Sequence, residues 1–170
     1  MLIGCILICY KTFSQSSKTS LRSVESLPTW FRSQAVLHDY DGIYSVSGAV
    51  DPNFLEADFN GQGHLDIAVF IVETKSLKKG ILIQHREDNT MHILGAGTSI
   101  GTFDDFSWMD HWQINMDSTA EETVFSENFD IVGSKTVQIT NIAIEVSSSE
   151  SPSNLIVWNE TKYFWIHTGD

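Results

Sequence analysis

Oxygen-bearing groups alternate along residues 58–66 in a spacing that suits a hard cation. Side-chain oxygens fall at the first, third, fifth and ninth positions of this loop, and a backbone carbonyl at the seventh completes the set. In chain order the ligands would be Asp58, Asn60, Gln62, His64 and Asp66. Because only Asp58 and Asp66 are carboxylates, we predict weak calcium binding, with a dissociation constant of roughly 10⁻⁴ to 10⁻³ M or weaker.

The same loop has a second interpretation that needs no ion. Asp58 and Asp66 would accept hydrogen bonds from backbone N–H groups, and Gly61 and Gly63 would take positive φ angles that other residues adopt at a cost. Both interpretations predict a tight loop that leads into the apolar run at 67–72. Both stay open at the level of the sequence.

The segment DFNGQGHLDIAVFI, residues 58–71, resembles the FG-GAP segment of integrin alpha-subunit propeller blades. The resemblance implies calcium bound by the side chains of Asp58, Asn60 and Gln62, the carbonyl of His64 and the closing carboxylate of Asp66. A propeller needs about four to eight such blades, and the chain has one copy. The resemblance therefore implies a local hairpin and not a propeller. The chain is also similar to short secreted bacterial proteins with a single FG-GAP-like segment, which implies no activity.

An apolar run of nine residues occupies positions 2–10. It is too short to cross a bilayer, which takes about 20 residues, and its length is typical of a signal peptide. We therefore predict a signal peptide at 1–15, a linker at 16–23, and a single β-rich domain at 24–170 of a secreted or periplasmic protein. The alternative is a buried strand at 2–10.

The composition limits the partners that the chain can bind. Its formal charge is −12, from 22 acidic and 10 basic residues, and no basic cluster is present to neutralise phosphates. This charge argues against nucleic acid and suits cations or basic proteins. Cys5 and Cys9 lie inside the expected signal peptide, so we expect no disulfide in the mature chain. No later segment is long enough to cross a membrane.

Short apolar runs separated by polar turns predict a mainly β fold. The run at 67–72 is rich in β-branched residues and predicts a strand buried on both faces. With 81–85 and 91–94 it should form an antiparallel meander. Further strands are expected at 113–116, 122–125, 137–146, 155–158 and 163–167, with a serine-rich loop at 147–154. We predict one twisted antiparallel meander sheet with little helix, and a small α+β domain as the alternative.

An acidic and aromatic stretch at 104–112 is the best candidate for a ligand surface away from the loop. Indoles beside carboxylates suit carbohydrate or cationic ligands, through stacking and cation–π attraction. The candidate residues are Asp105, Trp108, Asp110 and Trp112, with Asp104 and His111 beside them. The alternative is that both indoles cover the sheet while the carboxylates cap a turn.

Catalytic patterns are weak in this chain. The six histidines show no paired spacing that would mark zinc, although His85 and His92 flank a tight turn and could face each other. No serine stands in a G-x-S-x-G context, and no glycine-rich phosphate loop precedes a helix. We therefore predict an exported acidic binding module that recognises a protein or glycan outside the cytoplasm. The alternatives are an inhibitor or immunity-type protein that binds a basic enzyme, and a small hydrolase.

Overall fold

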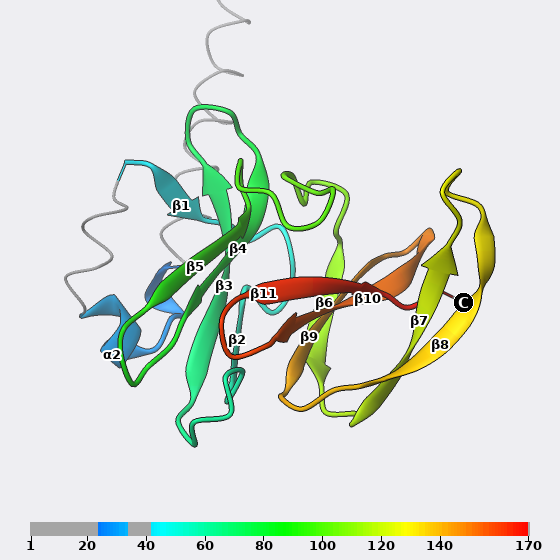
Figure 1. Ribbon diagram of the computed structural model, residues 1–170. Helices are drawn as coiled ribbons and strands as arrows, with labels where there is room; N and C mark the ends of the chain where they lie inside the picture. Colours follow the sequence, from blue (N-terminus) through cyan, green and yellow to red (C-terminus); the bar gives the residue numbers. More distant parts are fainter. Residues whose placement is uncertain (1–23, 34–41, 170) are drawn as a thin grey trace, which may run out of the picture.

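A computed structural model describes residues 24–33 and 42–169 (Figure 1). The expected signal peptide and linker, and with them both cysteines, lie outside the described residues. Within these ranges the protein is mainly β with antiparallel strand pairing, as predicted. One short helix, α2 (Thr29–Arg32), follows Pro28, which stands at its N-cap. The prediction of a single sheet is wrong, because the described strands form three sheets.

The first sheet contains the predicted meander. Its strands β3, β4 and β5 pair in chain order, and β1 and β2 pair one after the other along the free edge of β3. The bounds are β1 (Tyr44–Val46), β2 (Phe54–Ala57), β3 (Asp66–Glu73), β4 (Lys79–Gln84) and β5 (Met91–Gly95). The loop at 58–66 therefore connects β2 to its own antiparallel partner, β3.

The second sheet has the order β11-β10-β9-β6, and β7 and β8 form a separate two-stranded hairpin. The bounds are β6 (His111–Asn115), β7 (Thr119–Phe125), β8 (Ile131–Gln138), β9 (Ala143–Ser148), β10 (Ser151–Trp158) and β11 (Tyr163–His167). The two sheets and the hairpin lie in succession across the molecule (Figure 1).

Two of the predicted segments differ from the structure. The expected strand at 137–146 is two strands, because β8 ends at Gln138 within the hairpin and β9 begins at Ala143 within the second sheet. The expected loop at 147–154 is mostly strand, since β9 runs to Ser148 and β10 starts at Ser151. The register of β10 shifts between Ser151 and Asn154, which gives Pro152 a place outside the regular ladder.

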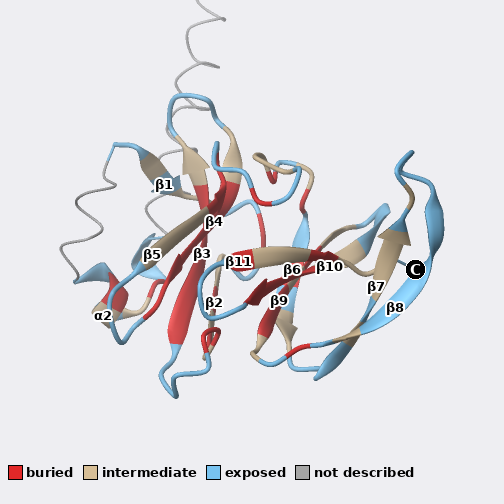
Figure 2. Ribbon diagram, viewed as in Figure 1, coloured by how far each residue is buried: buried red, intermediate tan, exposed pale blue. Residues whose placement is uncertain are grey.

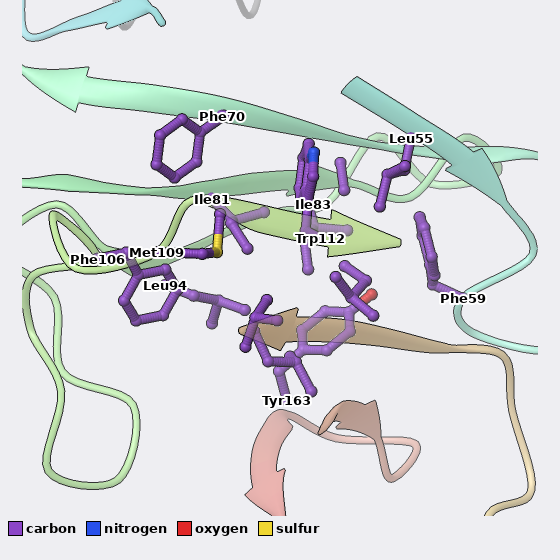
Figure 3. Close-up of a cluster of buried hydrophobic side chains, with 14 of the residues drawn as sticks. Leu55, Phe59, Phe70, Ile81, Ile83, Leu94, Phe106, Met109, Trp112 and Tyr163 are labelled. Atoms are coloured by element: carbon purple, nitrogen blue, oxygen red, sulfur yellow. The ribbon is translucent and has the colours of Figure 1, made fainter. Parts of the chain in front are cut away.

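The facing sides of the two larger sheets form the main core (Figure 3). Phe70 and Ile83 come from the first sheet, and Trp112 and Ile156 from the second; all are almost fully buried. Strand alternation sends every second side chain of each strand into this layer. Tyr163 and Trp165 of β11 also pack against this core.

The outer faces of both sheets are covered as well (Figure 2). Leu27 and Phe31, four residues apart, pack on the side chains of β3 that point away from the main core. Residues 67–71 of the predicted apolar run are therefore buried on both faces of β3, and Val72 is half-buried. On the other side, Val137 of β8 packs on a cluster that contains Leu155 and Ile166 of the second sheet. The rest of β8 is exposed, whereas β7 contains both exposed and half-buried residues.

Candidate functional site

The loop at 58–66 has the backbone geometry that its glycines predicted. Gly61 and Gly63 adopt φ angles of 75° and 86°. A side chain at Gly61 would meet the Asn141 side-chain oxygen at 2.5 Å. Asn141 in turn donates a hydrogen bond to the Trp158 carbonyl at 3.1 Å. The loop of the first sheet therefore packs directly against the second sheet at Gly61.

Asp66 ties this loop to the next turn of the sheet. Its carboxylate is fully buried and accepts N–H groups from Phe59 at 3.1 Å, from Asn60 at 3.3 Å and from Arg86 at 2.9 Å. Burial raises the pKa of the Asp66 carboxyl above its usual range, although the three N–H donors counteract part of this effect. Asp66 therefore has a structural role that requires no ion.

The remaining oxygens of the loop lie nearer to solvent. Asp58 accepts the N–H groups of Gln62 at 2.9 Å and Gly63 at 2.8 Å, and Asn60 accepts the Gln62 N–H at 3.1 Å. Each of these oxygens keeps a lone pair, because a carboxylate or amide oxygen accepts more than one bond. The oxygen atoms of Asp58, Asn60, Gln62 and the His64 carbonyl thus have the chemistry to bind a hard cation weakly. The described residues contain no cluster of three or more His, Cys, Asp and Glu side chains that could hold a metal.

Replacing Asp66 with Ala should lower the free energy of unfolding by about 2–4 kcal/mol, even in calcium-free buffer, because buried N–H groups lose their acceptor. The matched control is Asp58→Ala, whose N–H donors are exposed to water. That variant should lose less than about 1 kcal/mol. Urea unfolding measures both, and equal losses would contradict the structural role of Asp66.

The acidic and aromatic stretch does not form the expected single surface. Trp112 is 1% exposed in the main core, and its indole N–H donates to the Pro52 carbonyl. The expected exposure of Trp112 is therefore wrong. The segment is not helical, and the alternation of β6 from His111 onward turns Trp112 inward while His111 stays exposed.

The carboxylates of this stretch hold neighbouring segments in place. Asp105 accepts the backbone N–H of Lys79 at 2.9 Å and both donors of Ser107. Burial opposes ionisation of Asp105, but these hydrogen bonds lower its pKa overall. Asp110 accepts the N–H and hydroxyl of Ser149, and these bonds lower its pKa. Asp104 pairs with Lys78.

Trp108 is the one residue of the predicted set that lines a groove. This aromatic groove, about 560 Å³ in volume, lies between the hairpin, the turn after β9 and the loop before β6. The His167 ring contacts Phe125 and Phe103, with ring centroids 5.4 and 6.3 Å apart. Phe103 in turn packs on Trp108, 5.6 Å between centroids. Burial lowers the pKa of His167, so this wall stays neutral near pH 7. The volume and apolar walls of the groove suit a small ligand or a side chain of a partner protein.

The tip of the β7–β8 hairpin extends this groove, and the sequence analysis missed it. Phe125 and Ile131 line both the groove and the tip. Phe129 lies between them in a turn that Ser126 closes through hydrogen bonds with Phe129 and Asp130. The available signal was the apolar pair at 131–132 directly after the polar turn, but a strand was expected only from residue 137 in this region.

A second polar cluster lies buried between the two large sheets. The His85 and His92 rings face each other, as the turn suggested, with centroids 4.8 Å apart. His85 Nε2 lies 2.8 Å from the Tyr163 hydroxyl, and the Trp158 ring contacts both histidines. The Nε2 atom of His92 is buried without a hydrogen-bond partner.

Burial is the main cause that lowers the pKa of both histidines, and for His92 the neighbouring His85 lowers it further, while Asp88 counteracts this for both rings. The folded protein therefore favours the two neutral rings. Tyr163 also stays neutral, because burial raises the pKa of its hydroxyl.

This cluster predicts a loss of stability in mild acid. The unfolded histidines, with pKa near 6.5, bind protons that the folded rings resist, so the unfolding free energy should fall as the pH drops below about 6.5. Each ring contributes at most about 1.4 kcal/mol per pH unit. His92→Phe keeps an aromatic ring but cannot titrate. The free energy of unfolding, measured in urea at several pH values between 5 and 7, should change less with pH in His92→Phe than in the wild type. An equal change with pH in both proteins would contradict the prediction.

Comparison of the chain with protein-family models, curated proteins and solved structures gives no match. Among the helices of the described ranges, none has the length and apolar composition to cross a membrane.

Proposed function

We propose that the protein is an exported binding module that recognises another protein through its hairpin tip and the adjacent aromatic groove. One observation carries this proposal. Phe129 stands at the tip with its side chain 82% exposed and its backbone in the left-handed region, at φ 63°. A bulky residue in that region costs free energy, and an exposed aromatic ring gains nothing from burial to offset it. Such outliers gather at functional sites. Leu77 in the β3–β4 turn has the same φ of 63° and is also exposed, but its chain neighbours are polar and it lies outside the groove. Phe129 is distinguished by the apolar surface beside it.

The neighbours of Phe129 support a protein partner over a glycan. Ile131 is 70% and Val132 is 63% exposed, and together with Phe125 they continue the apolar surface of the tip into the groove. Exposed apolar patches of this kind mark protein interaction sites. Glycan sites depend on aromatic rings and polar groups, so exposed aliphatic side chains favour a protein.

The charge of the hairpin indicates a basic partner. Residues 117–138 contain five acidic side chains and one basic one, Lys135. Lys135 is already paired with Glu122 at 2.9 Å. Glu127 and Asp130 flank Phe129 in the turn, so a partner would meet an apolar ring between carboxylates. Complementary positive charge would speed and orient the encounter. An inhibitor of a basic enzyme, one of the alternatives from the sequence, is a specific form of this function.

The small-hydrolase alternative gains no support from the groove. Glu150 is the one carboxylate among the described residues that line it. Glycoside hydrolysis needs two carboxylates across a cleft.

Site-specific cross-linking in the native host tests the protein-binding proposal. Phe129→p-benzoylphenylalanine should give a covalent adduct with a protein on illumination, because the probe stands at the proposed contact. Leu77→p-benzoylphenylalanine is the matched control, since Leu77 has the same φ of 63° and is 68% exposed, but it lies in the β3–β4 turn of the first sheet, outside the groove. Trp108→Ala combined with the probe at 129 should reduce the adduct yield at least about threefold.

Two results would contradict the proposal. Equal adducts from positions 77 and 129 would mean non-specific contact, and no adduct at 129 would remove the tip as a protein site. Binding to a glycan array that is lost in Trp108→Ala would instead support the glycan alternative.

We also propose that calcium binds weakly at the loop and stabilises it. The support is the oxygen donor set of Asp58, Asn60, Gln62 and His64 described above. At 2 mM calcium, a dissociation constant of about 0.1–1 mM would add roughly 0.7–1.8 kcal/mol to the unfolding free energy. Asp58→Asn keeps the shape and removes one charge, so it should reduce this gain. No calcium-dependent change in the melting temperature of the wild type would leave only the hydrogen-bonded loop.

A further inference from the structure

We infer that β8 offers its free edge to the same partner, which adds an extended basic strand to the hairpin. This inference rests on the proposed function and specifies how the partner binds. Among the described strands, β8 pairs only with β7. An unpaired edge presents a row of backbone donors and acceptors to another chain.

The register identifies the backbone groups of β8 that point outward. The Ile139 N–H donates to the Ser118 carbonyl at 2.8 Å, one step beyond the pair Thr119↔Gln138. In an antiparallel ladder, residues alternate between pairs that exchange both hydrogen bonds and pairs that exchange none. The N–H and C=O groups of alternate β8 residues therefore point away from β7, namely those of Ser134, Thr136 and Gln138.

The edge of β8 is long and lacks the usual protection. The strand has eight residues, and all except Val137 are exposed. Natural edge strands are often short, or carry proline, a bulge or inward-pointing charge. Residues 131–138 contain no proline, and the one irregularity in the ladder is at the start of β8, where Val132 has no partner on β7, so the edge from Gly133 to Gln138 is regular.

Charge selects the occupant of this edge. Glu121 on β7 accepts hydrogen bonds from the hydroxyls of Ser134 and Thr136. Its carboxylate therefore lies beside two β8 residues whose backbone groups face the free edge. A second copy of this chain would bring the same acidic hairpin against it, within two molecules of charge −12. Like charges directly opposite each other destabilise strand pairing. A foreign strand rich in Lys or Arg would instead meet complementary charge.

A labelled nine-residue peptide of alternating lysine and valine is the probe, with its glutamate–valine counterpart as the charge control. Ser134→Pro removes one outward N–H and leaves the β7 ladder intact, because proline is tolerated where the N–H faces solvent. Ser134→Ala is the matched control, since it also loses the hydroxyl contact with Glu121 but keeps the N–H. Fluorescence anisotropy at low salt measures the affinities.

The lysine peptide should bind the wild type and Ser134→Ala within about twofold of each other. It should bind Ser134→Pro roughly two- to tenfold more weakly, the effect of one lost hydrogen bond. Equal affinity for the Pro and Ala variants, no binding of the lysine peptide, or equal binding of the glutamate peptide would each overturn the strand-addition inference. If Ser134→Pro does not fold, the same comparison is made at position 136, where Thr136→Pro removes the outward N–H and Thr136→Val is the matched control that keeps it.

The cross-link at position 129 separates this inference from the proposed function. A specific protein adduct at 129 together with equal peptide affinities would retain the binding module and reject strand addition. The absence of the adduct would reject the proposed function itself.

Discussion

The structure depends on one constraint, which is that both faces of β3 must be buried. Its sequence offers apolar side chains on both sides, Ile67 and Val69 to one face and Ala68 and Phe70 to the other. One cover is small, namely Leu27 and Phe31 around the short helix α2. The other is the whole second sheet. That sheet is itself apolar on both faces, so it needs a further cover, which Val137 and Ala120 of the hairpin supply. The layers end at the hairpin, which has no further cover among the described residues.

Contacts through the loop at 58–66 and through His85 fix how the two large sheets meet. Asp66 begins β3 and at the same time holds the loop at 58–66 and the backbone after β4. Gly61 of that loop lies against Asn141, which is bonded to β10. The His85 and Tyr163 pair adds a contact from the first sheet to the second. Because Gly61 and His85 contact residues bonded to or within the second sheet, changes at these positions affect both large sheets, whereas the hairpin tip contacts neither.

The sequence was informative where a local pattern had one physical solution. The run at 67–72 is short and rich in β-branched residues, which favours a strand buried on both faces, and the glycines at 61 and 63 favour a tight loop. The meander β3–β4–β5 followed from short turns. The sequence was ambiguous where a pattern had two solutions. The segment 137–146 alternates apolar and polar residues as one long strand would, and the polar pair Thr140-Asn141 is the single local sign that it leaves one sheet at Gln138 and enters another at Ala143.

The candidate site was only partly predictable for the same reason. Trp108 and Trp112 look equivalent in the sequence, yet the start of β6 at His111 sends Trp112 into the core and leaves Trp108 at the groove. The groove is built from segments distant in the chain, such as Phe103, Phe125 and His167, and no local pattern brings them together. Phe129 carries the functional proposal through its backbone angle and exposure, which only the folded turn defines.

Native-state hydrogen exchange, read at single amides, tests the central claim that a closed core ends in a one-sided, open hairpin. The account predicts that the amides of β3 and β4 exchange only through global unfolding, and that along β8 the amides of Lys135 and Val137 are protected while those of Ser134 and Thr136 exchange almost freely. Uniform protection along β8, equal to that of β3, would contradict it, because the edge would then be covered and the hairpin would not be the open last layer.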